Sequence, residues 1–173
     1  MEMKAEYLGN KELLKLEKTA FLASGTIASG TVLRCYDWAT EMRERGECVV
    51  SGFSSKLEQD VLHFLLKGKQ PIIIVLARRM YKAIPEELRR PLAENRLLII
   101  SVCDAMRQSR ATALARNRYV CEMSERVLFV GVTERSSLNT LKNDFKDKVL
   151  PSGLQMEDRD VGMAGLMMNK SRT

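Results

Sequence analysis

The sequence is poor in the residues that most often carry metal, redox or hydrolytic chemistry. It contains one histidine, His63, and four cysteines with no Cys-x-x-Cys pair among them. Because zinc and redox sites usually show such pairs, we expect four reduced, mostly buried thiols, no metal and no cofactor. His63 falls inside an expected helix rather than in a loop that follows a strand, which disfavours a Ser-His hydrolase.

Long apolar runs are also absent. The longest, residues 72–77 and 97–100, fall far short of the roughly 20 residues that a membrane-spanning helix needs. The first 18 residues are charged helix formers and differ from a signal peptide. We therefore expect a soluble, cytoplasmic protein that makes no membrane contact.

Arginine is unevenly distributed along the chain. The formal net charge is +6, and 11 of the 16 arginines lie between Arg78 and Arg135, where Lys82 is the only lysine among 12. Arginine pairs with phosphate oxygens through a planar fork and stacks on bases, whereas lysine acts as a hydrated point charge. The bias favours recognition of an anion or a nucleic acid over simple solubility, although scattered surface charge stays an alternative.

Segments rich in apolar residues alternate with segments of helical periodicity. Apolar strands are expected at residues 19–24, 47–52, 71–77, 97–102 and 127–132, with helices between them. Short connections between them predict an α/β fold of three layers, α/β/α, with a Rossmann-like, mainly parallel, doubly wound sheet of about five or six strands. We expect a leader helix at 1–18, one domain at 19–150 and a loosely attached tail at 151–173.

Polar residues follow several of the expected strands. Parallel strands place such residues at the carboxyl edge of the sheet, where open α/β folds bind ligands. The small-residue loop at Ser24 and Gly25 fits either a phosphate cradle or an ordinary turn, since it matches neither Gly-x-Gly-x-x-Gly nor a Walker loop. Arg78 follows the third strand, and the last strand lies between an Arg-Asn-Arg segment and a Glu-Arg-Ser-Ser turn. These groups predict a phosphate-binding site.

Several of these motifs together resemble the DNA-processing protein A (DprA/Smf) family. The resemblance rests on Val-Val-Ser-Gly-Phe at 49–53, the strand at 72–76, Arg-Asn-Arg at 116–118 and Glu-Arg-Ser-Ser at 134–137. It implies a Rossmann-like, non-enzymatic protein that binds single-stranded DNA, forms homodimers and loads a RecA-type recombinase during transformation or repair. It also implies a DNA pocket, and with the edge residues above the candidate binding residues are Ser24, Gly25, Ser51, Gly52, Arg78, Arg116, Asn117, Arg118, Glu134 and Ser136.

The chain departs from the family pattern in two loops. Ser54 to Glu58 stand where the family usually has Ala-Arg-Gly-Ile-Asp, and Ser24-Gly25-Thr26 stand where it has Gly-Ser-Arg. The second change removes an arginine from the implied pocket, unless Lys56 or Arg34 takes its place. The chain therefore resembles a diverged member that is limited to the family's core.

A small-nucleotide protein is the alternative interpretation. Related Rossmann-like families bind or hydrolyse nucleoside monophosphates and show a Pro-Gly-Gly-x-Gly-Thr loop, which this sequence lacks. Glu134 would be the catalytic carboxylate in such an enzyme, and an ion pair with a neighbouring arginine is its simpler role.

Overall fold

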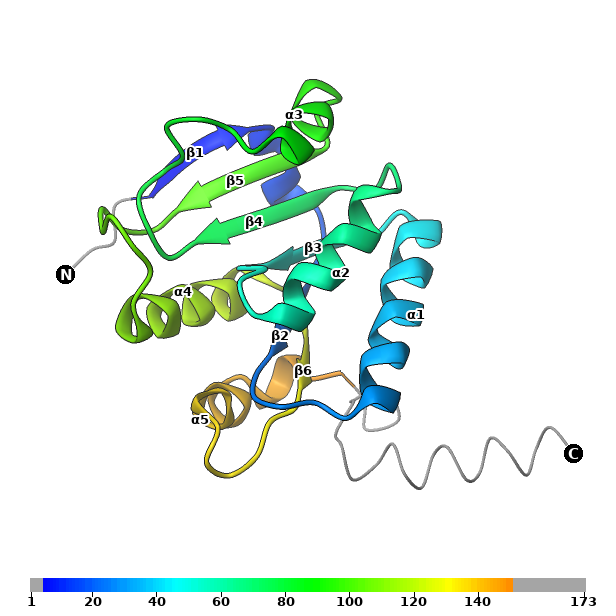
Figure 1. Ribbon diagram of the computed structural model, residues 1–173, viewed down its shortest axis with the longest axis vertical. Coiled ribbons are helices and arrows are strands. Elements are labelled where there is room, and N and C mark those ends of the chain that lie inside the picture. Colours follow the sequence, from blue (N-terminus) through cyan, green and yellow to red (C-terminus); the bar gives the residue numbers. More distant parts are fainter. Residues whose placement is uncertain (1–4, 151–173) are drawn as a thin grey trace, which may run out of the picture.

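The computed structural model describes residues 5–150, which are built on a six-stranded sheet (Figure 1). The strands follow the order β1-β5-β4-β3-β2-β6; β1 is antiparallel to β5 and the other neighbouring pairs are parallel. The mainly parallel sheet confirms the expected fold class. The bounds are β1 (Glu6–Gly9), β2 (Lys18–Ala23), β3 (Cys48–Ser51), β4 (Ile72–Leu76), β5 (Leu97–Ser101) and β6 (Arg126–Val130).

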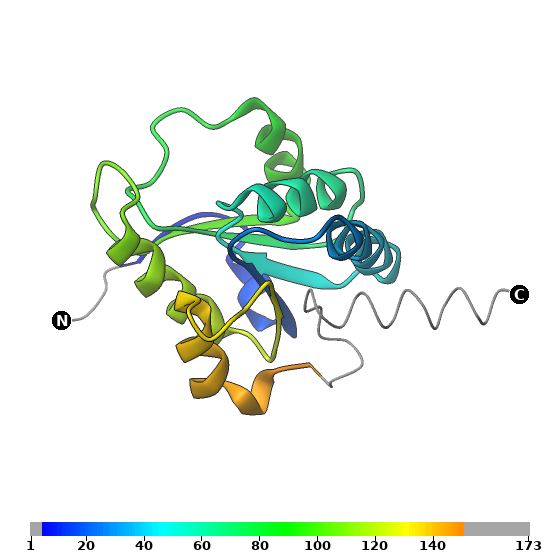
Figure 2. The same cartoon turned by 60° about the horizontal axis from the view of Figure 1, so that its bottom comes forward.

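Helices cover both faces of the sheet and give the three expected layers (Figure 2). One face carries α1 (Ser29–Arg45), α2 (Lys56–Leu66) and α3 (Glu86–Ala93), and the other carries α4 (Arg110–Met123) and α5 (Ser137–Asp144). The chain crosses from one face to the other after β5, because β6 pairs with β2 at the far side of the sheet. The sheet is therefore doubly wound, with its switch point between β2 and β6.

The apolar strands form these layers because both of their faces are buried. Every residue of β4 and β5 is buried, and their side chains alternate between the core under α1, α2 and α3 and the core under α4 and α5. Local signals fix the helix ends. Ser55 and Glu58 form a capping box at the start of α2, and Gly46 ends α1 in the left-handed conformation.

The expectation of a leader helix over 1–18 is wrong for the residues that the structure describes. They form β1 and a short 3-10 helix, η1 (Lys11–Lys15), and β1 pairs antiparallel with β5. The physical reason lies in the edge of β5, whose backbone groups need a partner, and in Gly9, whose φ of 108° does not fit a continuous helix. Leu13 then buries its side chain on the sheet.

Two other expectations concern α3 and the end of the chain. The helix expected between the strands at 71–77 and 97–102 is α3, which begins at Glu86 directly after Pro85, its N-cap. The expected tail at 151–173 lies outside the described residues. None of the helices within residues 5–150 is long and apolar enough to cross a membrane.

Candidate nucleic-acid interface

The loops after β2 and β6 meet at the switch point of the sheet. Ala23 and Val130 end these neighbouring strands side by side, and the hydroxyls of Ser24 and Ser136 lie 2.8 Å apart in a hydrogen bond. Gly131 permits this approach, because its φ is 71° and a Cβ there would collide with the carbonyl oxygen of Ser24. The structure thus brings together two residues expected in the site, Ser24 and Ser136.

The start of α1 faces the same switch point. Its N-cap, Ala28, makes no side-chain capping hydrogen bond, and no acidic residue lies in its first turn. Gly25 in the preceding loop is exposed, with a φ of 73° and open space where a side chain would stand. Helix N-termini attract anions because their backbone N–H groups point outward and the helix dipole is positive there. The loop therefore offers neutral hydrogen-bond donors to a phosphate.

The buried carboxylate of Glu58 holds the loop after β3 in place. Glu58 is 3% exposed and accepts hydrogen bonds from the backbone N–H groups of Ala23 at 3.0 Å, Ser54 at 3.0 Å and Ser55 at 3.2 Å. Glu58 thereby ties the end of β2 to the loop after β3. The spacing of Ser55 and Glu58 is that of a capping box, but the burial of the Glu58 carboxylate has no signal in the sequence.

Arg116 is buried, contrary to the expectation that it lies exposed at the sheet edge. It is 2% exposed, and its guanidinium donates to the carbonyl of Val75 at 3.2 Å and to the hydroxyl of Ser54 at 3.0 Å. Burial lowers the pKa of Arg116, and the nearby charge of Glu58 opposes that effect. Gly52 lies directly against this guanidinium, with no room for a Cβ. Arg116 therefore supports the loops rather than facing solvent.

The other members of the Arg-Asn-Arg segment point elsewhere. Asn117 accepts a hydrogen bond from Nε of Arg116 at 2.7 Å. Arg118 faces α5, where it forms a 2.7 Å ion pair with Asp144 and lies over the ring of Phe145. Successive helix residues are rotated by about 100°, so three neighbours cannot all face the sheet edge. The structure separates Arg116 from Arg118. Ser51 is also buried, and its hydroxyl accepts from the N–H of Phe53.

Basic side chains gather where β4 and β5 end. We call Arg78, Arg79, Lys82, Arg107 and Arg110 the basic edge. Their loops are joined by hydrogen bonds from the N–H of Arg79 to the carbonyl of Ala105 at 2.8 Å and from the hydroxyl of Ser101 to the carbonyl of Arg78 at 2.6 Å. Within residues 5–150, none of the five forms an ion pair. Sequence reasoning singled out only Arg78, although the surplus of arginine pointed to this part of the chain.

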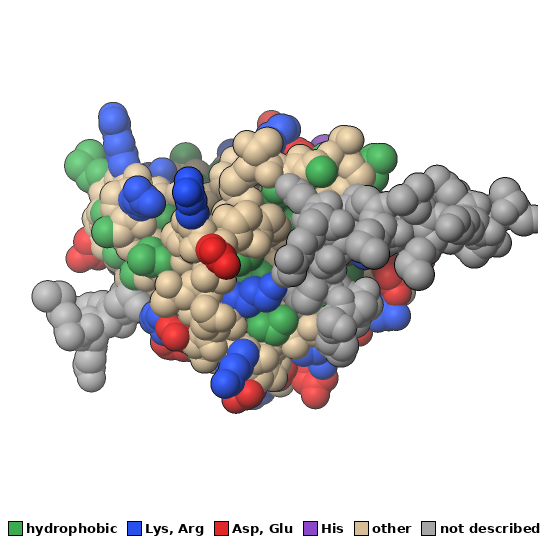
Figure 3. Space-filling view, turned by 90° about the horizontal axis from the view of Figure 1, so that it is seen from below, with side chains coloured by type: hydrophobic (Ala, Val, Ile, Leu, Met, Phe, Trp, Pro, Cys, Tyr) green, Lys and Arg blue, Asp and Glu red, His purple; other side chains and the backbone are tan. Residues whose placement is uncertain are grey.

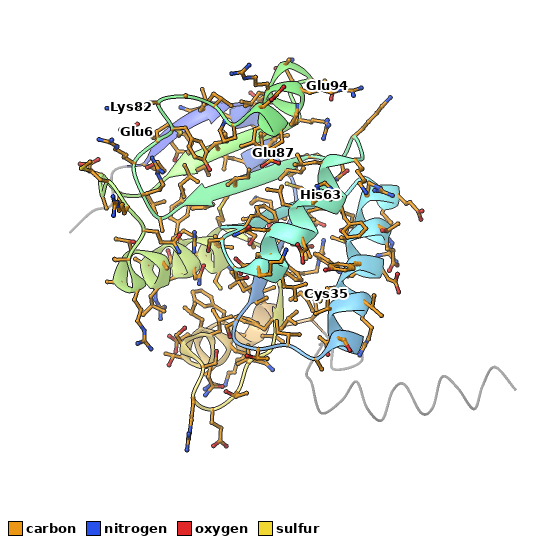
Figure 4. The ribbon with its side chains drawn as sticks, in the orientation of Figure 1. Glu6, Cys35, His63, Lys82, Glu87 and Glu94 are labelled. Atoms are coloured by element: carbon orange, nitrogen blue, oxygen red, sulfur yellow. The ribbon has the colours of Figure 1, made fainter. Side chains whose placement is uncertain are left out.

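The figures show how this surface lies. Figure 4 labels Lys82 at the upper left, on the loop between β4 and α3, with Glu6 of β1 as its acidic neighbour. Figure 3 views the molecule from the side of α5, and several Lys and Arg side chains project at its left, the direction in which β4 and β5 point in Figure 1. Arg107 and Arg110 are exposed, and Arg78 and Arg79 are partly buried. The carboxyl edge is therefore accessible and predominantly basic beside β4 and β5.

Glu134 and Arg135 are exposed in the loop between β6 and α5. Within the described part of the chain neither forms an ion pair, so the expected pairing of Glu134 with an arginine is absent there. Residues 5–150 also contain no group of three His, Cys, Asp or Glu side chains that could hold a metal ion. What the edge offers is hydroxyls, backbone N–H groups and guanidinium groups, which bind phosphates.

Two solved structures share this fold. The chain matches DNA processing protein A from Helicobacter pylori, in a structure describing its single-stranded DNA binding mode, with a TM-score of 0.68 and 18% identity over 97% of this chain and 87% of that one. It matches DNA processing protein A from Streptococcus pneumoniae with a TM-score of 0.67 and 18% identity, covering 87% of this chain and 57% of the other. No curated protein sequence gives a significant match.

The sequence also matches a protein-family model. The model for DNA recombination-mediator protein A aligns with residues 6–149, which include all six strands and all five α-helices. The resemblance found in the motifs is therefore confirmed over most of the chain. This protein belongs to the DNA recombination-mediator protein A family.

Proposed function

We propose that the protein binds single-stranded DNA through its phosphates along the carboxyl edge of the sheet and does not change it chemically. The observation that carries this proposal is the basic edge, in which two hydrogen-bonded loops carry five cationic residues that form no ion pair among residues 5–150. Unpaired arginines at a sheet edge leave their donors available to phosphate oxygens. Family membership and the likeness to DNA processing protein A support the same ligand.

The switch point supplies a second group of phosphate contacts. Ser24, Ser136 and the start of α1 lie beside β2, and the basic edge lies beside β4 and β5. Neighbouring strands are about 4.8 Å apart, so β2 and β5 are separated by roughly 14 Å along the edge. Single-stranded DNA of several nucleotides spans this distance and contacts both the switch point and the basic edge. Because these contacts reach phosphates rather than base edges, they tolerate any sequence.

A titration of labelled oligo-dT tests this proposal. Affinity should be micromolar or better at low salt and should fall steeply as salt rises, since each neutralised phosphate of a single strand releases about 0.7 counterion. Nucleoside monophosphates should compete poorly, because one phosphate engages only part of the edge. Binding that is absent at low salt would refute the proposal. Tight binding of a monophosphate with no affinity for oligo-dT would favour a small-nucleotide protein instead.

We further propose that the protein acts as a homodimer that passes its strand to a RecA-type recombinase. The support is the family's description as a recombination mediator. Sedimentation should show a species of twice 19.6 kDa at tens of micromolar. Recombinase filaments should also form faster on strands that already carry the protein. A monomer that leaves filament growth unchanged would limit the function to DNA binding.

A further inference from the structure

A cleft of about 390 Å³ lies between α2 and α3 beside β4. Its base is apolar and is formed by Phe53, Ile74 and Leu88, all three of them buried. The side chains of Leu62 and Tyr81 add to its walls. The volume lies within the range of small-molecule sites, and the lining combines an apolar base with polar groups that can set orientation. The cleft can therefore accept a flat ring.

The opening of the cleft is acidic. Asp60 and His63 come from α2 and Glu87 from α3, and Figure 4 shows His63 and Glu87 on the two helices that flank it. Glu87 forms no ion pair among residues 5–150. Burial alone would raise the pKa of Asp60, but hydrogen bonds from Lys56 and Tyr36 hold it below its usual value. Lys56 also forms a 2.9 Å ion pair with Asp60, so Glu87 is the carboxylate at the opening that would repel a phosphate and accept N–H donors.

The acidic cleft adjoins the basic edge. Tyr81 lines the cleft, and the guanidinium of Arg78, a member of the basic edge, lies 5.5 Å from the centroid of the Tyr81 ring. Gly52 and Phe53, in the loop after β3, also line the cleft. Phe53 adopts a φ of 48°. Such a conformation is strained for a side chain of this size and is found most often where a loop shapes a site.

This charge pattern selects among possible occupants. A basic peptide would meet the cations of the basic edge, and an acidic peptide would meet the carboxylates of the cleft. A nucleotide strand satisfies both surfaces, because its phosphates are anionic and its bases are neutral rings that carry N–H donors. Aromatic side chains such as Tyr81 also stack on bases.

We propose that the cleft holds one base of the bound strand and that guanine is the base it favours. This inference rests on the proposed function. Guanine carries two adjacent donors, N1–H and the N2 amino group, which match the two oxygens of one carboxylate. Adenine and cytosine present a donor beside an acceptor, and thymine presents a single donor between two acceptors. Glu87, unpaired among residues 5–150, is the carboxylate that reads the guanine edge.

The test compares oligo-dT with the same oligonucleotide carrying one central dG, dA or dC. The dG strand should bind about fivefold or more tightly than the others, the lower end of the discrimination that a bidentate base contact gives. Glu87→Gln should abolish this preference and leave the affinity for oligo-dT nearly unchanged. Glu86→Gln is the matched control, since Glu86 occupies the same first turn of α3 but does not line the cleft.

Equal affinity for all four strands would overturn the inference, and so would loss of the preference in Glu86→Gln. Displacement of the strand by an arginine-containing peptide but not by guanosine would assign the cleft to a peptide. Failure of every oligonucleotide to bind would refute the proposed function instead.

Guanosine alone tests the cleft separately, because His63 is the only histidine in the sequence and the NMR signal of its ring reports on the opening of the cleft. That signal should shift with guanosine and not with thymidine.

Discussion

Glu58 and Arg116 hold the same residue, Ser54, from two sides. The backbone N–H of Ser54 donates to Oε1 of Glu58 at 3.0 Å, and its hydroxyl accepts from Nη2 of Arg116 at 3.0 Å. Glu58 also accepts from the N–H of Ala23, and Arg116 donates to the carbonyl of Val75. The end of β2, the loop after β3 and strand β4 are therefore all held by these two buried, oppositely charged side chains. The geometry of the carboxyl edge depends on this pair.

Arg116→Ala should destabilise the fold strongly. The substitution removes the donors to Val75 and Ser54 and takes a positive charge away from the surroundings of the buried Glu58, and each hydrogen bond lost from a charged group typically costs about 1.5–3 kcal/mol. Denaturant unfolding followed by circular dichroism measures this loss. Gly52→Ala should also destabilise the protein, because its new Cβ collides with the guanidinium of Arg116. If Arg116→Ala unfolds at the same denaturant concentration as the wild type, the supporting role assigned to this arginine is wrong.

The strands and most helices could be predicted because their signals are local. Ile72–Leu76 is an unbroken apolar run, and the capping box at Ser55 and Glu58 marks the start of α2. β1 could not be predicted in this way. It is a strand because it pairs with β5, some 90 positions away in sequence, and the charged residues around it also fit a helix. Partners distant in sequence decide such segments, and sequence patterns do not report them.

Three of the four cysteines should resist alkylation in the folded protein. Burial raises the pKa of Cys35, Cys48 and Cys121 to about 12 each, with nearby charges as smaller influences. A raised thiol pKa means less thiolate, so at pH 8 only about one molecule in ten thousand carries the reactive form at each of these sites. Cys103 is partly exposed and should react first. Mass spectrometry after iodoacetamide treatment should find one modified cysteine in native protein and four in urea. Rapid native modification of Cys121 would contradict its burial.

Glu134→Gln separates DNA binding from nucleotide hydrolysis. In the proposed function this change removes a negative charge from the edge, so affinity for oligo-dT should stay equal or rise slightly. In a nucleoside-monophosphate hydrolase the same change should lower turnover by about 100-fold or more, as loss of a general acid or base does. Chromatographic detection of free base from nucleoside monophosphates, alongside the DNA titration, distinguishes the two. Base release by the wild type that disappears in Glu134→Gln would establish the enzyme.

The candidate site was only partly predictable from sequence, and the reason is the direction of side chains. The motif at 116–118 indicated a binding segment, but α4 places Arg116 inside the fold and Arg118 against Asp144. Ser24 and Ser136 were predictable, since each follows the end of a strand and the two strands pair in parallel. Arg107 and Arg110 follow β5 in the same manner, yet no familiar motif contains them. Topology, rather than motif, would have identified them.

The last prediction locates the DNA on the basic edge. Arg107→Ala combined with Arg110→Ala should weaken oligo-dT binding by about 5- to 30-fold at low salt, because two exposed guanidinium groups no longer neutralise phosphates. The slope of log affinity against log salt should become shallower by about 1.4, or about 0.7 for each lost phosphate contact. Both side chains are exposed and lack ion pairs among residues 5–150, so the unfolding transition should not move. Fluorescence anisotropy at several salt concentrations measures both quantities.

Arg45→Ala is the matched control for this pair. Arg45 ends α1 at the opposite edge of the sheet, is largely exposed and pairs with Glu41, so its removal lowers the net charge without touching the carboxyl edge. A single Arg107→Ala or Arg110→Ala should therefore weaken binding more than Arg45→Ala does, although each removes one positive charge. If all three single variants lose affinity equally, the DNA responds to net charge alone and the basic edge is not its binding surface. If affinity falls only in the Arg107→Ala and Arg110→Ala variants, the bound DNA crosses the ends of β4 and β5, beside the opening of the cleft between α2 and α3.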